Sequence, residues 1–215
     1  MKWNRGILVS FVLSSILLAG CKSAYYSAWE KIGVYKRDLL KKRVVEARDD
    51  QKEAGQQFKD ALTRLKALYG FQGGDLEKVY DSLKSDFERS SDKAESVRKR
   101  VKEVESVGTD LFTEWEAELK DISSASLRDK SREQLRQTKS RYATLLDALK
   151  RAEQSMEPVL TQFRDQVLFL KHNLNAQALS SLQKEALSIQ DDITKLLAEM
   201  EHSIRQADSF IKELR

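Results

Sequence analysis

The fold is decided by the stretch from Leu76 to Leu119, which reads LEKVYDSLKSDFERSSDKAESVRKRVKEVESVGTDLFTEWEAEL. Its apolar residues recur every three or four positions, as on one face of a helix. They are Leu76, Val79, Leu83, Phe87, Ala94, Val97, Val101, Val104, Leu111, Trp115 and Leu119. Polar and charged residues fill most of the positions between them. The stretch therefore predicts one long amphipathic helix over about 75–121.

The same period continues on both sides and predicts three more helices, over about 25–69, 127–172 and 176–214. The segment between the first two helices contains Gly70, Gly73 and Gly74, which suit a tight reversal. Ser126 is expected to cap the third helix. Pro158 lies inside that helix, so a kink or a break is expected near Glu157. A further turn is expected at about 172–175.

Long helices of similar length with short links predict an all-α fold, with neighbouring helices antiparallel. Two arrangements remain open: one elongated antiparallel four-helix bundle, or two long coiled-coil hairpins. If the first hairpin folds near residue 72, the numbers of facing residues should sum to about 145. Trp29 then shares a layer with Trp115, Val44 faces Val101 and Phe58 faces Phe87. In the second hairpin, Met156 should face Ile193 and Leu149 should face Met200.

The N-terminus has a different character from the rest of the chain. Lys2 and Arg5 precede an apolar stretch from Ile7 to Leu18, which is short for a membrane span but suits a secretion signal. Leu18-Ala-Gly-Cys21 then resembles the lipobox of bacterial lipoprotein precursors, and Cys21 is the only cysteine. The resemblance implies a signal peptide over 1–20, cleavage between Gly20 and Cys21, and a lipidated tether over 21–28. The helical domain would follow over 29–214.

In such lipoproteins the cysteine carries a diacylglycerol on its sulfur and an acyl chain, typically palmitate, on its amino group. Cys21 would then anchor the protein to the membrane and would be available for neither catalysis nor a disulfide. Lys22, in place of an aspartate, implies sorting to the inner leaflet of the outer membrane, facing the periplasm. Tyr25 and Tyr26 follow at once, and either membrane contact or core packing suits them. Core packing is the preferred interpretation of Trp29.

No pattern of catalytic residues is present in the sequence. His172 lies at a predicted helix end and His202 on a charged face, and neither has the spacing of a metal ligand. We therefore expect neither an enzyme, nor a cofactor, nor a metal site. The net charge is +4, with basic clusters at Lys41-Lys42-Arg43 and Arg98-Lys99-Arg100. These clusters fit solvated helix faces, or else contact with anionic lipid. Nucleic acid is an unsuitable partner for an exported protein.

One stretch departs from the amphipathic pattern. Val167, Leu168, Phe169 and Leu170 are consecutive and are followed by His172, so apolar groups point all round the helix. Such a helix is either buried on every side, where the core widens, or it exposes an interaction patch. Both interpretations remain open from the sequence.

The mature chain resembles a family of Gram-negative lipoproteins of unknown function. The residues that carry the likeness are those of 25–40, Met156-Glu-Pro-Val-Leu160 and 165–175. The resemblance implies an exported, lipid-anchored helical protein, and it transfers no reaction. We expect a scaffold or interaction protein that contacts another envelope protein. The alternative is a membrane-surface module that binds anionic lipid through basic helix faces. Coiled-coil seams would also permit a homo-oligomer.

Overall fold

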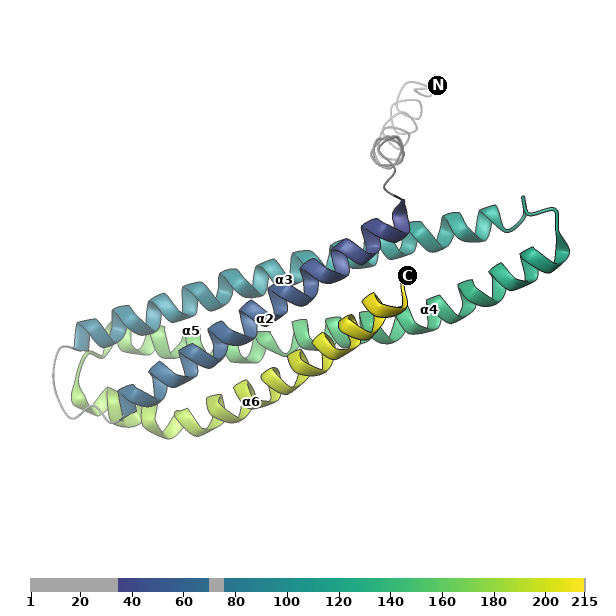
Figure 1. Cartoon of the computed structure of the whole chain (residues 1–215). Helices are drawn as coiled ribbons and strands as arrows, with labels where there is room; N and C mark the ends of the chain where they lie inside the picture. The colour runs from purple at the N-terminus through teal and green to yellow at the C-terminus, as the bar shows by residue number, and fades with distance from the viewer. Residues whose placement is uncertain (1–34, 70–75, 215) are drawn as a thin grey trace, which may run out of the picture. The chain divides into compact units, whose positions relative to one another are not determined.

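The computed structural model describes residues 35–69 and 76–214, without the side chains of residues 68–69, 176–180 and 183–187. The described residues are almost entirely helical, which confirms the all-α prediction (Figure 1). The helices are α2 (Lys36–Tyr69), α3 (Leu76–Glu118), α4 (Ala125–Gln154), α5 (Met156–His172) and α6 (Ala176–Glu213). The chain forms two compact units, Met1–Leu39 and Leu40–Arg215. The bundle described below belongs to the second unit.

Inter-helix ion pairs define the register between α2 and α3. Lys93 contacts Glu53, and Arg100 Nε donates to Asp50 Oδ2 at 3.1 Å. The numbers of these facing residues sum to 146 and 150, which confirms the predicted antiparallel hairpin within a few residues. The glycine-rich link lies outside the described residues. Trp29 does too, so its pairing with Trp115 stays a prediction.

The second hairpin also has the predicted register. Gln162 Nε2 on α5 donates to Asp192 Oδ2 on α6 at 2.6 Å, and Arg151 pairs with Glu199. The residue numbers in these pairs sum to 354 and 350, close to the expected pairing of Leu149 with Met200.

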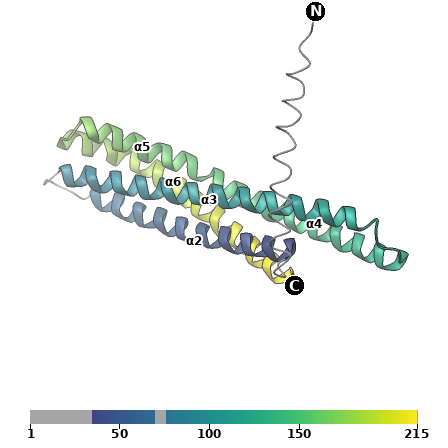
Figure 2. The ribbon, with the colours of Figure 1, turned by 90° about the horizontal axis from the view of Figure 1, so that it is seen from above.

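The two hairpins join in one four-helix bundle. Arg48 Nη1 on α2 donates to Asp208 Oδ1 on α6 at 2.8 Å. On the other side, Tyr142 on α4 donates its hydroxyl to the Val104 carbonyl of α3 at 3.1 Å. The bundle has four rods, which are α2, α3, α4 together with α5, and α6. Each rod therefore has two antiparallel neighbours, as the two views show (Figure 2). Of the two arrangements that the sequence left open, these contacts between the hairpins indicate the single antiparallel bundle.

The third rod is interrupted at one residue between α4 and α5. Ser155 keeps helical angles, φ −69° and ψ −13°, and its N–H still bonds to the Arg151 carbonyl at 3.0 Å. Pro158 has no N–H to offer the Gln154 carbonyl, so one hydrogen bond of the ladder is lost. The predicted disturbance near Glu157 is confirmed as a local irregularity.

Burial follows position along the helix more closely than residue type. In α3 the steps of three and four continue through Asp86 and Ser90, which are buried, while the neighbouring Phe87 is only half-buried. Phe87, which the helical period placed in the apolar seam, therefore lies at the edge of the core, and its pairing with Phe58 stays a prediction. In α6, Ser203 and Phe210 are likewise buried, whereas the apolar side chains of Ile204 and Ile211 are half-buried.

At one end, α3 and α4 extend past the end of α6, as a two-helix tip (Figure 1). Arg141 pairs with Glu213 in the last turn of α6, so α4 residues before Arg141 lie beyond it. Among the described helices only α3 and α4 form this tip, and two helices leave one side of each other uncovered, so Leu127 is 59% exposed. The hydroxyl of Ser124, not Ser126, caps α4, by accepting from the Leu127 N–H at 3.5 Å. Of the helices that the structure describes, none combines the length and apolar character that a bilayer crossing requires.

Candidate functional site

Several predicted site residues lie outside the described part of the chain. These are Gly20 and Cys21 at the predicted cleavage and lipidation site, and Tyr25 and Tyr26 at the predicted membrane contact.

The apolar run on α5 divides between the core and the surface. Val167 and Leu170 are buried, whereas Leu168 is 50% exposed and Phe169 is 39% exposed. Consecutive residues of a helix differ by about 100° in direction, so one packed face can enclose only part of such a run. His172 is exposed in the last turn of α5. Of the predicted interaction patch, Leu168, Phe169 and His172 are thus exposed and Val167 and Leu170 belong to the core; an interaction through the exposed residues stays a prediction.

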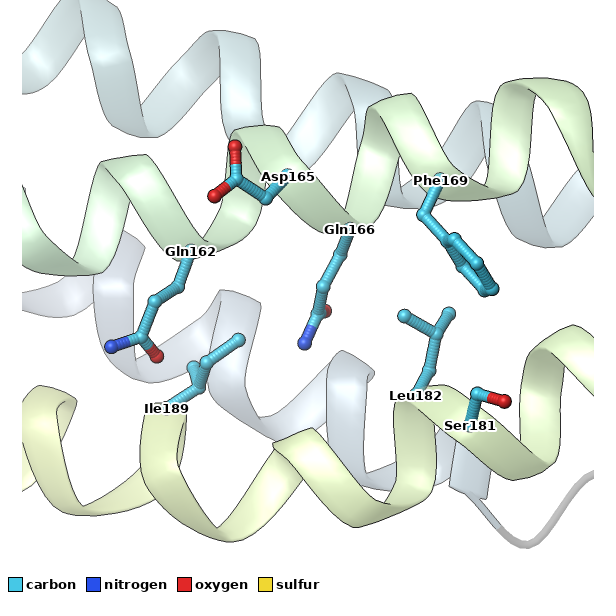
Figure 3. Close-up of a pocket in the computed structure, with 7 residues that line it drawn as sticks. All are labelled: Gln162, Asp165, Gln166, Phe169, Ser181, Leu182 and Ile189. Carbon is cyan, nitrogen blue, oxygen red and sulfur yellow. The ribbon is translucent and has the colours of Figure 1, made fainter.

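A pocket of about 380 Å³ opens between α5 and α6 beside Phe169. The two helices contribute opposite walls, and the Phe169 ring reaches toward α6 (Figure 3). The described lining residues are Gln162, Asp165, Gln166 and Phe169 from α5, and Ser181, Leu182 and Ile189 from α6.

Gln166 is the central polar group of this pocket. Its side chain extends from α5 toward α6, between Leu182 and Ile189 (Figure 3). The residue is only 4% exposed, yet neither Oε1 nor Nε2 has a hydrogen-bond partner among the described residues. Buried side-chain amides are normally paired, so this one marks a place where a partner is missing.

Gln162 lies one turn before Gln166, on the same face of α5. Its Nε2 donates to Asp192, but its buried Oε1 also has no partner among the described residues. Asp165 directs its carboxylate away from α6 in Figure 3. The pocket thus presents two free acceptors and one free amide donor beside the apolar side chains of Phe169, Leu182 and Ile189.

The sequence reasoning missed both glutamines because it took polar residues as the outer face of the helix. A signal was nevertheless present: Gln166 continues the series Val159, Phe163, Gln166, Leu170, whose steps of four, three and four follow the core seam. All four of these residues are buried. A polar residue in a seam position is the feature that could have located the pocket.

The buried carboxylate of Asp86 has a structural role. Arg64 Nε donates to its two oxygens at 2.9 and 2.8 Å, and Arg89 also contacts it. The hydrogen bond to Asp86 raises the pKa of Arg64, against the opposing effect of burial. Both partners are arginines that stay charged, so they hold the carboxylate by charged hydrogen bonds and exchange no proton with it.

The arginines of the two basic clusters are also engaged with neighbouring helices. Arg43 pairs with Glu103, Arg98 with Glu157, and Arg100 with Asp50. Within residues 35–69 and 76–214, no three histidine, aspartate or glutamate side chains gather closely enough to hold a metal ion.

The model of the family DUF2959, described as a protein of unknown function, matches residues 25–214 of this chain. The chain belongs to the DUF2959 family. No curated protein matches the sequence. The DUF2959 region contains the whole bundle and every residue of the pocket, and it begins four residues after Cys21.

Proposed function

We propose that this DUF2959 protein is a lipid-anchored helical scaffold of the cell envelope that faces the periplasm and works through protein contacts. The observation that carries the proposal is the N-terminal sequence, in which a basic start, a short apolar stretch and Leu18-Ala-Gly-Cys21 occur in the order of a lipoprotein precursor. The family match begins just after this segment, at residue 25, so the proposed leader and anchor precede the DUF2959 region.

The bundle suits a scaffold because its helices are long and tightly joined. A helix of 43 residues such as α3 is about 65 Å long at 1.5 Å per residue. Ion pairs link α2 to α3 and α6, and the core between them is densely apolar. The exposed side chains of Leu168 and Phe169 offer a contact surface at one end of this bundle.

The alternative, binding of anionic lipid through basic helix faces, has less support. Arg43, Arg98 and Arg100 each face a carboxylate of a neighbouring helix. Contact with a lipid headgroup would have to compete with these internal partners.

Changing Cys21 to serine tests the anchor. The variant should fold with unchanged helical content but leave the membrane fraction, and wild-type protein should yield an N-terminal peptide whose mass includes the acyl chains. Ser23→Ala is the matched control and should remain in the membrane. If the Cys21→Ser chain, once cleaved, still sediments with membranes, the lipid-anchor proposal is wrong. Density separation of the two membranes then tests the proposed outer-membrane location.

Contact with an envelope protein is tested separately, by cross-linking in intact cells. Leu168→Glu and Phe169→Glu place a charge on the exposed end of α5 and should abolish a specific cross-linked product. Leu127→Glu, at the distant tip of the bundle, is the control. A product that is equally abundant in all variants would exclude the α5 surface as the contact.

A further inference from the structure

The pocket between α5 and α6 has a defined pattern of unsatisfied hydrogen-bonding groups. Gln166 offers an acceptor and a donor on the same amide, and Gln162 offers one acceptor, because its nitrogen is held by Asp192. Residues four apart on a helix lie on one face, so the two amides are adjacent. A partner that satisfies both needs two donors and one acceptor close together.

The size and the walls of the pocket favour a ligand with an apolar body. A volume of about 380 Å³ is far larger than the roughly 30 Å³ that one water molecule occupies in the liquid. Phe169, Leu182 and Ile189 supply apolar walls. Water alone would satisfy the amides but would leave these walls hydrated, whereas an apolar group would displace that water.

The charges around the pocket favour a neutral ligand. No lysine, arginine or histidine is among the described lining residues, so none of these residues would offer an anion a counter-charge. Among the lining residues that the structure describes, Asp165 alone is charged; it is exposed and directs its carboxylate away from α6. A cation next to Gln166 would find two neutral amide oxygens there but no carboxylate of the described lining directed toward it, so its charge would not be neutralised.

We propose that this pocket binds a primary carboxamide carried on an apolar group. The carboxamide oxygen accepts from Gln166 Nε2, while one of its N–H groups donates to Gln166 Oε1, so that the two amides pair edge to edge. The second N–H donates to Gln162 Oε1. An ordinary trans peptide group cannot form this pair, because its N–H and its carbonyl point in opposite directions.

A primary carboxamide has two sources: a small amide molecule, or the side chain of a glutamine or asparagine in another polypeptide. The proposal goes beyond the scaffold function and does not depend on the lipid anchor. In both cases the pocket would recognise the same group, a neutral carboxamide with two N–H donors and one oxygen acceptor.

Ligand-observed NMR on the full-length chain in detergent tests the proposal with three probes of similar shape. Benzamide carries the complete donor and acceptor set, N,N-dimethylbenzamide lacks the donors, and benzoate carries a charge. Benzamide should bind with a millimolar Kd, as suits a ligand of this size, and the other two at least about tenfold more weakly. Equal signals from all three probes would overturn the proposal, as would the absence of binding, which would leave only water in the pocket.

Two variants separate the pocket from unspecific binding. Gln166→Leu should weaken benzamide binding at least about tenfold, since both paired hydrogen bonds are lost. Gln51→Leu is the matched control, because Gln51 is also buried with an unpartnered amide but does not line this pocket. Circular dichroism confirms that each variant is folded. Unchanged binding in the Gln166→Leu protein, or an equal loss in both variants, would refute the assigned site.

Peptides distinguish the two sources. A blocked tripeptide with glutamine between two leucines is compared with the same peptide containing methionine in place of the glutamine. Tighter binding of the glutamine peptide than of benzamide assigns the site to a polypeptide side chain. If benzamide binds and the glutamine peptide binds no better than the methionine peptide, the ligand is a small amide. Failure of the Cys21 anchor test would affect neither result.

Discussion

Replacing Gly108 by alanine should destabilise the bundle, although alanine is the better helix former. Gly108 is buried in α3, directly beneath the ring of Tyr142 on α4. A Cβ atom at residue 108 would lie 2.3 Å from Cζ and 2.4 Å from Oη of Tyr142. Such distances are far inside van der Waals contact, so the ring would have to move.

The ring has little freedom to move. Its centroid is 5.1 Å from that of Phe112 and 6.1 Å from that of Phe210, and its hydroxyl donates to the Val104 carbonyl at 3.1 Å. Overpacking costs about 1–3 kcal/mol, and loss of the hydroxyl hydrogen bond costs about 1 kcal/mol. The higher helix propensity of alanine offsets about 1 kcal/mol of this loss in unfolding free energy. The net loss in unfolding free energy should be about 1–3 kcal/mol.

Urea unfolding followed by circular dichroism measures this loss. Gly55→Ala is the matched control, because its Cβ would lie 3.4 Å from Met200 Sδ, an ordinary contact, and should stabilise the protein by about 0.5–1 kcal/mol. In a Tyr142→Leu background, where the ring is absent, Gly108→Ala should become neutral or stabilising. The reasoning is refuted if Gly108→Ala has the same effect with and without the Tyr142 ring, or if it stabilises the wild-type protein.

Three further predictions concern buried polar groups. Gln51→Leu should raise the unfolding free energy by about 1–3 kcal/mol, because it removes an unpartnered buried amide; a loss of stability in urea would show that the amide is paired. Asp86→Asn should lower the unfolding free energy by about 1–2 kcal/mol, because Arg64 and Arg89 lose a charged acceptor. The exposed control Asp129→Asn should change the unfolding free energy by less than about 0.5 kcal/mol. Burial, and then the charge of Glu105, raise the pKa of Tyr142 above 10.0, so its contribution to stability is complete below pH 10.0 and falls as the pH rises above it. Tyr142→Phe should show a shallower loss of stability in this alkaline range, and equal slopes for the two proteins would contradict the assignment.

The local period of the sequence was sufficient to locate the helices. The stretch after Leu76 predicted a helix over 75–121, and α3 extends from Leu76 to Glu118. The hairpin registers could also be predicted, because short links leave antiparallel neighbours little freedom to slide. Apolar spacing is a weaker guide to burial at the tip, where the apolar Leu127 in the first turn of α4 is 59% exposed. Of the described helices, only α3 and α4 reach this end, so a place in the helical period is not enough to bury Leu127.

The candidate site was predicted only in part. The run at residues 167–170 indicated an unusual surface, and Leu168 and Phe169 are indeed exposed. The pocket beside them could not be predicted, because its opposite wall comes from α6 and its polar centre, Gln166, has no distinctive sequence context. Whether an amide in a seam position finds a partner depends on side chains that are distant along the chain.

The sequence by itself determined that this chain forms long antiparallel helices, because helical period, links and hairpin register are properties of neighbouring residues. Only the tertiary structure decided that two hairpins close into one bundle, since this depends on contacts such as Arg48 with Asp208. It also decided that Gly108 provides room for Tyr142, and that Gln166 is buried beside an open volume. Space and hydrogen-bond satisfaction are set by how helices from different parts of the chain pack together, and no local pattern encodes them.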